Sequence, residues 1–279
     1  MGLASVLIEF AIITGVMLGV ATVLFVDLGS VRSVIVDRER ARTLAPYAVA
    51  LIIILLINRS ARQAGPLLSW LIGWEITALI ESIEGEFVVW VQSFESPMLT
   101  EYLAFMYLYG YAFLLIFPFV LYYVLPNTRA FRELAIAFGL NYTLGLLCYI
   151  LFIAYGPRNQ LADVVQPLLY QHHPLSQLVT REVNVNTNVF PSLHTSLSVT
   201  VALMAWRTRK EYPLWVPIAA IFAASVTVAT VYTGIHWVID VIAGIALAAF
   251  SVYAGARFAD YRPDLRSSKW LPERLERTR

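Results

Sequence analysis

Long apolar runs dominate the chain, and most of them approach the roughly 20 residues that a helix needs to cross a bilayer. Apolar runs of this length are typical of membrane spans rather than of helices in a soluble core. The pattern therefore predicts an all-α, polytopic transmembrane helix bundle. We expect seven spans, at Ser5–Val26, Thr43–Ile57, Tyr102–Leu125, Glu133–Tyr155, Leu193–Trp206, Leu214–Tyr232 and Trp237–Ala256.

A different pattern separates the second and third predicted spans. The stretch Pro66–Val91 mixes Leu, Ile and Trp with four glutamates, Glu75, Glu81, Glu84 and Glu86. Such a mixture favours an amphipathic helix that lies in the interface over an eighth span. We expect its tryptophans to lie at the depth of the lipid headgroups. They are Trp70, Trp74 and Trp90.

Composition agrees with a membrane protein and gives no sign of nucleic-acid binding. Hydrophobic residues make up 59% of the 279 residues and charged residues only 14%, whereas soluble domains carry about 25% charged residues. The net charge is only +1, so the chain lacks the strongly positive charge that is typical of nucleic-acid-binding proteins. Cys148 is the one cysteine, so no disulfide forms within the chain. Asn58-Arg59-Ser60 matches the acceptor pattern for N-glycosylation.

The basic residues predict an orientation. Of the 20 Lys and Arg residues, 16 fall in segments that seven spans place on one face, namely 27–42, 126–132, 207–213 and 257–279. The positive-inside rule assigns this face to the cytoplasm. We therefore expect the N-terminus outside, the C-terminus inside, and all four histidines on the outer side.

Three outer span ends carry residues suited to chemistry. Arg158 follows the fourth span, His194 opens the fifth within Phe190-Pro191-Ser192-Leu193-His194, and His236 and Asp240 open the seventh. Because these ends share one depth in the predicted topology, we expect the side chains to converge on one site at the membrane surface.

The two histidines suit phosphoryl transfer. His236 and Asp240 are four residues apart and share one helical face. The carboxylate can hold one tautomer of the ring, so that the other ring nitrogen acts as nucleophile or base. His194 would then supply a proton to the leaving alkoxide. A purely structural His236–Asp240 pair also fits the spacing.

A phosphate group needs donors and cations around it. Ser192 and the free N–H groups of a helix that starts near Pro191 can bind phosphate oxygens, and Arg158 would neutralise charge. Further candidates for phosphate binding are Thr233 and Arg181. Arg158 also fits a snorkelling role, and the hydroxyls also fit plain helix packing.

No metal or other cofactor is expected at this site. The remaining histidines, His172 and His173, have no carboxylate or thiol at ligand spacing. We interpret both as interfacial residues.

These motifs resemble those of the type 2 phosphatidic acid phosphatase superfamily of membrane lipid phosphatases and phosphotransferases. That family shows Lys, six residues and Arg-Pro, then Pro-Ser-Gly-His, then Ser-Arg, five residues, His, three residues and Asp. Pro191–His194 matches the second motif with Leu193 at the glycine position, and His236 with Asp240 matches the end of the third. The resemblance covers roughly residues 130–256.

The departures from the family pattern point to one branch. The first motif is not recognisable, because Pro157-Arg158 reverses the usual order and no lysine precedes Lys210. Ala229-Thr230 stand where the third motif has Ser-Arg. A Pro-Ser-Leu-His motif without that arginine is similar to inositol phosphorylceramide synthases, and sphingomyelin synthases also lack the arginine. The resemblance implies transfer of a phosphoryl or phosphodiester group to a lipid alcohol through a histidine-linked intermediate.

We therefore expect a membrane enzyme with lipids as substrates, either a lipid phosphatase or a phosphotransferase. Its parts would be residues 1–101 with the N-terminal spans and the outer interfacial helix, a catalytic transmembrane core at 102–256, and a basic cytoplasmic tail at 257–279. Two alternatives stay open. One is a transporter that uses the His236–Asp240 pair as a proton relay, and the other is a non-catalytic family member.

Overall fold

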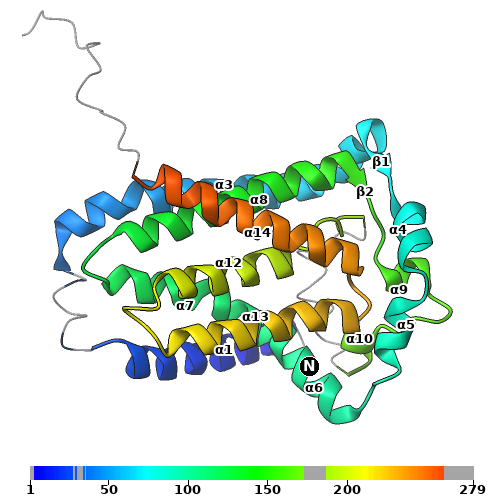
Figure 1. The fold of residues 1–279 in the computed structure, drawn as a ribbon, viewed down its shortest axis with the longest axis horizontal. Coiled ribbons are helices and arrows are strands. Elements are labelled where there is room, and N and C mark those ends of the chain that lie inside the picture. Colours follow the sequence, from blue (N-terminus) through cyan, green and yellow to red (C-terminus); the bar gives the residue numbers. More distant parts are fainter. Residues whose placement is uncertain (1–2, 28, 30–33, 35, 173–186, 261–279) are drawn as a thin grey trace, which may run out of the picture.

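Long helices run roughly along one axis of the molecule (Figure 1). The computed structural model describes the chain except residues 1–2, 28, 30–33, 35, 173–186 and 261–279. It confirms the predicted all-α bundle, and in the described part six helices are long and apolar enough to cross a membrane. The elements are α1 (Leu3–Phe25), α3 (Arg38–Ile72), β1 (Trp74–Glu75), α4 (Thr77–Glu84), α5 (Phe87–Gln92), α6 (Pro97–Phe105), η1 (Met106–Gly110), α7 (Tyr111–Val124), α8 (Arg129–Leu151), β2 (Phe152–Ile153), α9 (Pro157–Gln160), α10 (Leu168–His172), α12 (Leu193–Arg207), α13 (Trp215–Tyr232) and α14 (Val238–Phe258).

Every predicted span falls on a helix, although some ends differ. The third begins earlier, at Pro97, because the Ser96 hydroxyl accepts a hydrogen bond from the Leu99 N–H and a proline suits the first helical turn. The fourth ends earlier, because Phe152 and Ile153 leave the helix and pair with β1. The fifth, α12, has only 15 residues. It therefore extends about 22 Å, less than the roughly 30 Å of the hydrocarbon core.

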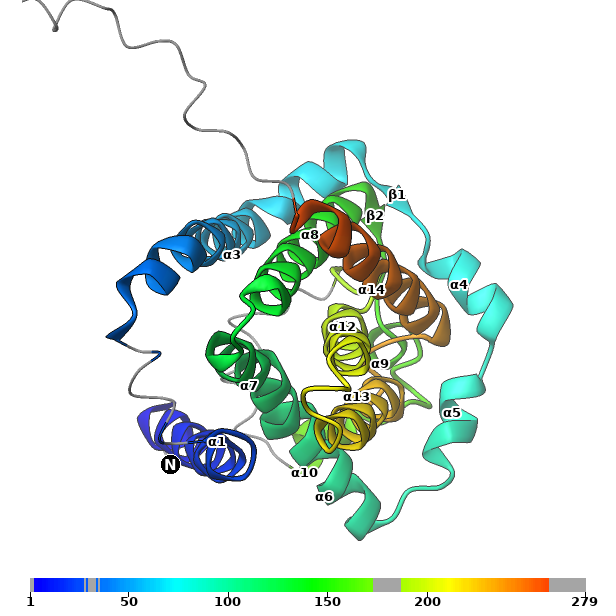
Figure 2. The ribbon, with the colours of Figure 1, turned by 60° about the vertical axis from the view of Figure 1, so that its left-hand side comes forward.

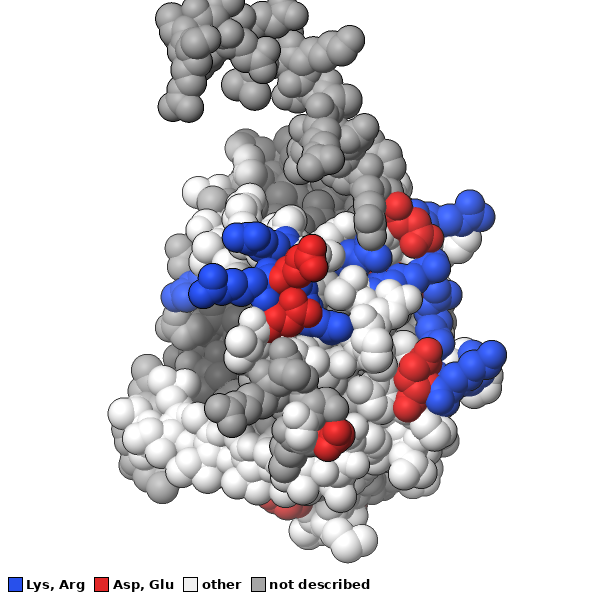
Figure 3. All heavy atoms as spheres, turned by 90° about the vertical axis from the view of Figure 1, so that its left-hand side faces the viewer, with Lys and Arg blue, Asp and Glu red and all other residues white. Residues whose placement is uncertain are grey.

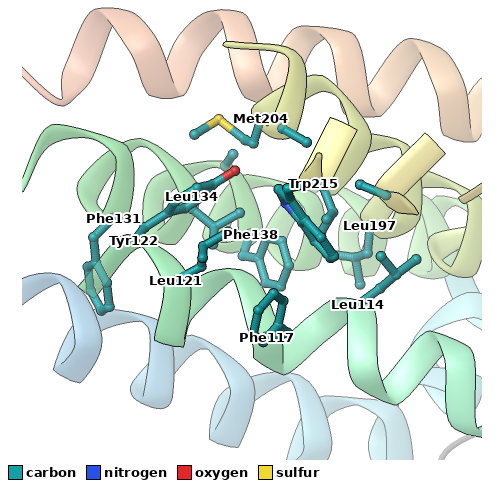
Figure 4. Close-up of a cluster of buried hydrophobic side chains, with 14 of the residues drawn as sticks. Leu114, Phe117, Leu121, Tyr122, Phe131, Leu134, Phe138, Leu197, Met204 and Trp215 are labelled. Atoms are coloured by element: carbon teal, nitrogen blue, oxygen red, sulfur yellow. The ribbon is translucent and has the colours of Figure 1, made fainter. Parts of the chain in front are cut away.

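The short helix α12 lies at the centre of the bundle. It packs against α7, α8, α13 and α14, while α1 and α3 lie further out (Figure 2). Leu197 and Met204 on α12 are fully buried in a cluster that also contains Phe117 and Trp215 (Figure 4). Because lipid tails are as apolar as leucine, close packing rather than exclusion from water holds such helices together.

Glycines allow the closest approaches between these helices. A Cβ atom at Gly244 of α14 would lie 2.6 Å from the carbonyl oxygen of Ser192, at the start of α12. A Cβ atom at Gly255 would lie 2.8 Å from the carbonyl oxygen of Glu133 on α8. The backbone of α14 therefore touches both neighbours directly.

The segment 66–91 is not the single amphipathic helix that its composition predicts. α3 continues as far as Ile72, and the chain then forms β1 and the two short helices α4 and α5. β1 pairs in parallel with β2, which fixes this segment against the end of α8. A turn at Gly85, whose φ of 54° suits glycine, separates α4 from α5. The tryptophans Trp70, Trp74 and Trp90 are all exposed, as expected for an interfacial role.

Helix α3 extends past the end of the predicted second span because its polar residues find partners on α8. Asn58 donates a hydrogen bond from its side-chain amide to the Tyr142 carbonyl at 3.0 Å, and Ser69 donates one to the Tyr149 carbonyl at 2.9 Å. Asn58 is only 4% exposed. Its match to the glycosylation pattern is therefore misleading, because a buried side chain cannot accept a glycan.

Basic residues gather at the end of the bundle that faces the viewer in Figure 3. Here the buried carboxylate of Glu133 joins two helices, since Arg129 donates to it at 2.6 Å and Arg207 at 3.0 Å. Arg40 donates hydrogen bonds to the carbonyls of Tyr123 and Leu125 at the end of α7. The segments α4, α5, α9 and α10 lie at the opposite end (Figure 1).

The tight contact at Gly244 predicts a cost for any side chain there. Gly244→Ala should lower the free energy of unfolding by about 1–3 kcal/mol, because its methyl group would push α14 away from the backbone of α12. Thermal unfolding of the detergent-purified protein measures this effect. Gly15→Ala on α1 is the control, since a Cβ atom there would meet nothing within 4 Å. Equal melting temperatures for the two variants would contradict the close approach.

The separation of the basic end from the opposite end predicts the labelling pattern of intact cells. In a Cys148→Ser background, a cysteine in place of Gln171 on α10 should react with an impermeant thiol reagent added outside. One in place of Arg209, between α12 and α13, should not. Both native side chains are exposed, so burial does not bias the comparison. The reverse pattern would refute the predicted orientation.

Candidate active site

The predicted site residues lie at the end of the bundle away from the basic cluster. His194 is the second residue of α12, and Ser192 caps that helix. His236 lies in the connection between α13 and α14, while Asp240 lies in the first turn of α14. Arg158 belongs to α9. The site is therefore built from elements that are distant in the sequence.

The two histidines face each other. The ring centroids of His194 and His236 are 6.2 Å apart, with an angle of 56° between the ring planes. His236 is 4% exposed, whereas His194 is partly exposed. A phosphorus atom between the rings would have a candidate nucleophile on one side and a candidate proton donor on the other.

Asp240 orients His236. Its Oδ2 atom lies 3.4 Å from Nδ1 of His236 and accepts a hydrogen bond from the Trp237 N–H at 2.8 Å. The carboxylate is fully buried, and its Oδ1 atom has no hydrogen-bond partner among the described residues. A carboxylate in such surroundings favours the tautomer that carries a proton on Nδ1, which leaves Nε2 with a lone pair.

The backbone holds the two halves of the site together. The Ser192 N–H donates to the carbonyl of Asp240 at 3.0 Å, so the start of α12 is tied to the start of α14. Gly234 adopts a φ of 70°, and a Cβ atom there would lie 2.7 Å from Val165 and 3.3 Å from the Cβ of Arg158. Only glycine lets the α13–α14 connection turn this tightly beside α9.

Burial keeps His236 neutral. It lowers the pKa of His236 to about 3, chiefly because the charged ring would lose its hydration, and the positive charge of Arg158 adds to the effect. A hydrogen bond between the ring and the Val189 backbone opposes the shift. At neutral pH the imidazole therefore has the unprotonated nitrogen that a nucleophile needs.

Arg158 lies close to the histidines and has an unused donor. Its backbone N–H donates to the Gly234 carbonyl at 2.9 Å, and its guanidinium lies 4.6 Å from the centre of the Tyr170 ring. The buried Nη1 atom has no hydrogen-bond partner in the described part of the chain. A cation held in this way suits an anionic ligand, because both its charge and a donor remain available.

The other predicted phosphate ligands, Ser192, Thr233 and Arg181, differ in whether their side chains are available to a phosphate. The Ser192 side chain is buried and accepts a hydrogen bond from the Thr195 N–H at 3.3 Å, as a helix cap does. The hydroxyl of Thr233 donates its proton to the Ala229 carbonyl at 2.7 Å, which leaves no proton for a phosphate oxygen in this conformation. Arg181 lies outside the described residues.

Nothing in the described part of the chain gathers three or more His, Cys, Asp or Glu side chains that suit a metal ion. His173 lies outside that part, and His172 ends α10. The expectation of a metal-independent site remains a prediction.

Two aromatic residues next to His194 did not stand out in the sequence. The rings of Tyr107 and Tyr111 lie 4.6 and 4.4 Å from the His194 ring, within the usual range of aromatic contacts. Tyr107 belongs to η1, a π-helical turn within the long helical segment, and Tyr111 directly follows it. Such turns often occur at functional sites, but no sequence pattern predicts them. The contacts orient the imidazole of His194.

Glu84, one of the four glutamates of the segment 66–91 that we expect at the interface, reaches the site. Its carboxylate accepts hydrogen bonds from the N–H groups of Val238 and Ile239, at 2.9 and 2.5 Å. Its acidic character was the only signal in the sequence. It did not identify the start of α14 as the partner, because that helix lies far away in the sequence. Burial raises the pKa of Glu84, these two hydrogen bonds oppose the shift, and the charge of Asp240 adds to it.

The residue that departs from the Pro-Ser-Gly-His motif has a partner that makes room for it. Leu193 is buried against α8, where a Cβ atom at Gly145 would lie 2.7 Å from its Cδ2 atom. A leucine can therefore occupy the position of the motif glycine, because the facing residue on α8 is a glycine and leaves room for its side chain.

Comparison with known proteins agrees with the motifs. A family model described as the PAP2 superfamily matches residues 69–254, about two thirds of the chain, which includes α4 and the whole site. No curated protein and no solved structure matches significantly. Because the match covers both histidines, Asp240 and the helices that carry them, the chain belongs to the PAP2 superfamily.

Proposed function

We propose that this protein cleaves or transfers the phosphate group of a membrane lipid through a phosphohistidine-type intermediate on His236. Superfamily membership supports activity on phosphate esters. The observation that carries the proposal is the pair of facing histidines, 6.2 Å apart, with the buried carboxylate of Asp240 at 3.4 Å from His236. The site lies at one end of helices that are long and apolar enough to cross a bilayer, which favours a lipid substrate.

In the first step, Nε2 of neutral His236 attacks phosphorus while the bond from phosphorus to the leaving oxygen breaks. His194 donates its proton to that oxygen, so the lipid alcohol leaves neutral. Asp240 stabilises the positive charge that develops on the His236 ring. Arg158, the Ser192 hydroxyl and N–H groups at the start of α12 would hold the phosphate oxygens.

In the second step, water or a lipid alcohol attacks phosphorus of the phosphohistidine. His194, now neutral, takes the proton of the attacking hydroxyl, and the bond from phosphorus to His236 breaks. Both histidines return to their starting states. Water gives a phosphatase, and an alcohol gives a phosphotransferase.

The small number of cations favours a phosphodiester substrate and transfer like that of inositol phosphorylceramide synthases. Among the described residues, Arg158 is the one cation whose charge lowers the pKa of His236. A phosphomonoester carries about −1.5 to −2 charges near neutral pH, whereas a diester carries less. Lipid mass spectrometry after incubation with mixed phospholipids and candidate alcohols identifies both donor and acceptor. A new phosphodiester lipid would support transfer, and release of phosphate alone would support hydrolysis.

The mechanism predicts which residue carries the covalent adduct. After an early quench with labelled substrate, in the presence of EDTA, an acid-labile and alkali-stable adduct should map to His236. His236→Ala should abolish it, because Nε2 of His236 is the proposed nucleophile. His194→Gln should slow its formation by about 10²–10⁴-fold for an alkyl ester, which is the usual contribution of a general acid.

A matched substrate separates the two roles. For a nitrophenyl ester, whose leaving group needs no proton, His194→Gln should have a much smaller effect, while His236→Ala should remain inactive. Asp240→Asn should remove most of the rate with both substrates and leave the fold intact. Label on His194, or activity in His236→Ala, would overturn the mechanism.

The low pKa of His236 predicts the acidic side of the pH profile. A lowered pKa means that the ring stays neutral as the pH falls through 6.5, the ordinary value for histidine. Protonation of the nucleophile should therefore not limit kcat/KM between pH 6.5 and 5.5. On the alkaline side, activity on an alkyl ester should fall as His194 loses its proton, whereas activity on the nitrophenyl ester should not. An acid limb centred near pH 6.5 with both substrates, which persists in His194→Gln, would contradict this assignment.

A further inference from the structure

The carboxylate of Glu84 lies at the start of the helix that carries Asp240. Glu84 is the last residue of α4, and its two oxygens accept hydrogen bonds from Val238 and Ile239, the first two residues of α14. Asp240 directly follows these two residues, and His236 precedes them with Trp237 in between. The side chain is partly buried there, whereas that of Glu86 is exposed.

The start of a helix needs such acceptors. The first N–H groups of an α-helix have no partner within the helix, and they carry the positive end of its dipole. α14 begins in the sequence Trp237–Ile239, which contains no Ser, Thr, Asn or Asp to cap it. Two carboxylates divide the task, because Asp240 accepts from the Trp237 N–H and Glu84 accepts from the next two donors.

This division matters for Asp240, which has a second task. Its Oδ2 atom serves both the Trp237 N–H and, at the longer distance of 3.4 Å, Nδ1 of His236. Unpaired donors at Val238 and Ile239 would compete for the same carboxylate, since a buried N–H group without a partner is costly. A carboxylate drawn further toward the helix would turn away from the imidazole.

We propose that Glu84 is a positioning residue for the reaction: by capping the first two N–H groups of α14 it leaves Asp240 directed at His236. This role rests on the proposed function of His236 and Asp240 as nucleophile and orienting carboxylate. Glu84 acts through Asp240 and touches no substrate.

Other contacts fix α4 where this cap requires it. The hydroxyl of Thr77, at the start of α4, accepts a hydrogen bond from the Tyr155 N–H at 3.0 Å. The Tyr155 carbonyl in turn accepts one from the indole N–H of Trp237 at 2.8 Å. Both ends of α4 are therefore joined to the segment that carries the site.

The test compares Glu84→Ala with Glu84→Gln and with the control Glu86→Ala, which removes an exposed carboxylate with no capping hydrogen bond. Glu84→Ala should lower kcat for an alkyl ester by about 10–100-fold, the usual loss when a reacting group is misplaced, with KM changed less than about twofold. Glu84→Gln keeps one acceptor oxygen and should lie between Glu84→Ala and the native protein. The control should match the native protein.

A double-mutant cycle with Asp240→Asn separates positioning from general damage. If Glu84 acts through Asp240, Glu84→Ala should change kcat by less than about twofold in the Asp240→Asn background. Equal factors in both backgrounds would overturn the proposal, since the two residues would then act independently. Unchanged kcat in Glu84→Ala would also overturn it.

A second measurement does not depend on activity. In ¹⁵N-histidine-labelled protein in detergent, the Nδ1 signal of His236, assigned with His236→Gln, reports its hydrogen bond to Asp240. We expect this signal to move in Glu84→Ala and to stay in place in Glu86→Ala. An unmoved signal in Glu84→Ala would refute the role of Glu84 even if no substrate is turned over. If the signal moves in Glu84→Ala but the native protein has no activity on phosphate esters, the proposed function is refuted. The positioning of Asp240 by Glu84 then still holds.

Discussion

A fully buried carboxylate at the start of α14 is the constraint on which the rest of the site depends. Asp240 lies where a helix enters the bundle, and a carboxylate there is costly unless hydrogen bonds or an opposite charge compensate it. The structure gives it the Trp237 N–H and the ring of His236. The need of one side chain for partners thereby fixes the position and tautomer of the proposed nucleophile.

Satisfying this carboxylate requires that several segments meet. The carbonyl of Asp240 accepts from Ser192, which caps α12 and so places His194. Gly244 removes the Cβ atom that would otherwise hold α14 and α12 apart. Glu84 takes the neighbouring N–H groups. The short helix α12 fits this arrangement, because it begins at the depth of the site and ends near the basic cluster.

The two histidines of the candidate site differ in burial and in their neighbours. His236 is buried beside Arg158, and both conditions favour the neutral ring. His194 is less buried and lies against Tyr107 and Tyr111. Two residues of one type therefore meet different surroundings, which is the usual way in which proteins assign acid and base roles to similar groups.

The sequence by itself determined the helical class, the positions of the spans and the pair His236–Asp240, because apolar runs and a four-residue spacing are local properties of a chain. It also placed Pro191–His194 at a helix start. Only the tertiary structure decided that the chain after Ile72 forms a strand and two short helices, that Asn58 is buried, and that Glu84 reaches α14. Each of these depends on a partner far away in the chain, namely β2, Tyr142 and Val238, and no local pattern identifies such a partner.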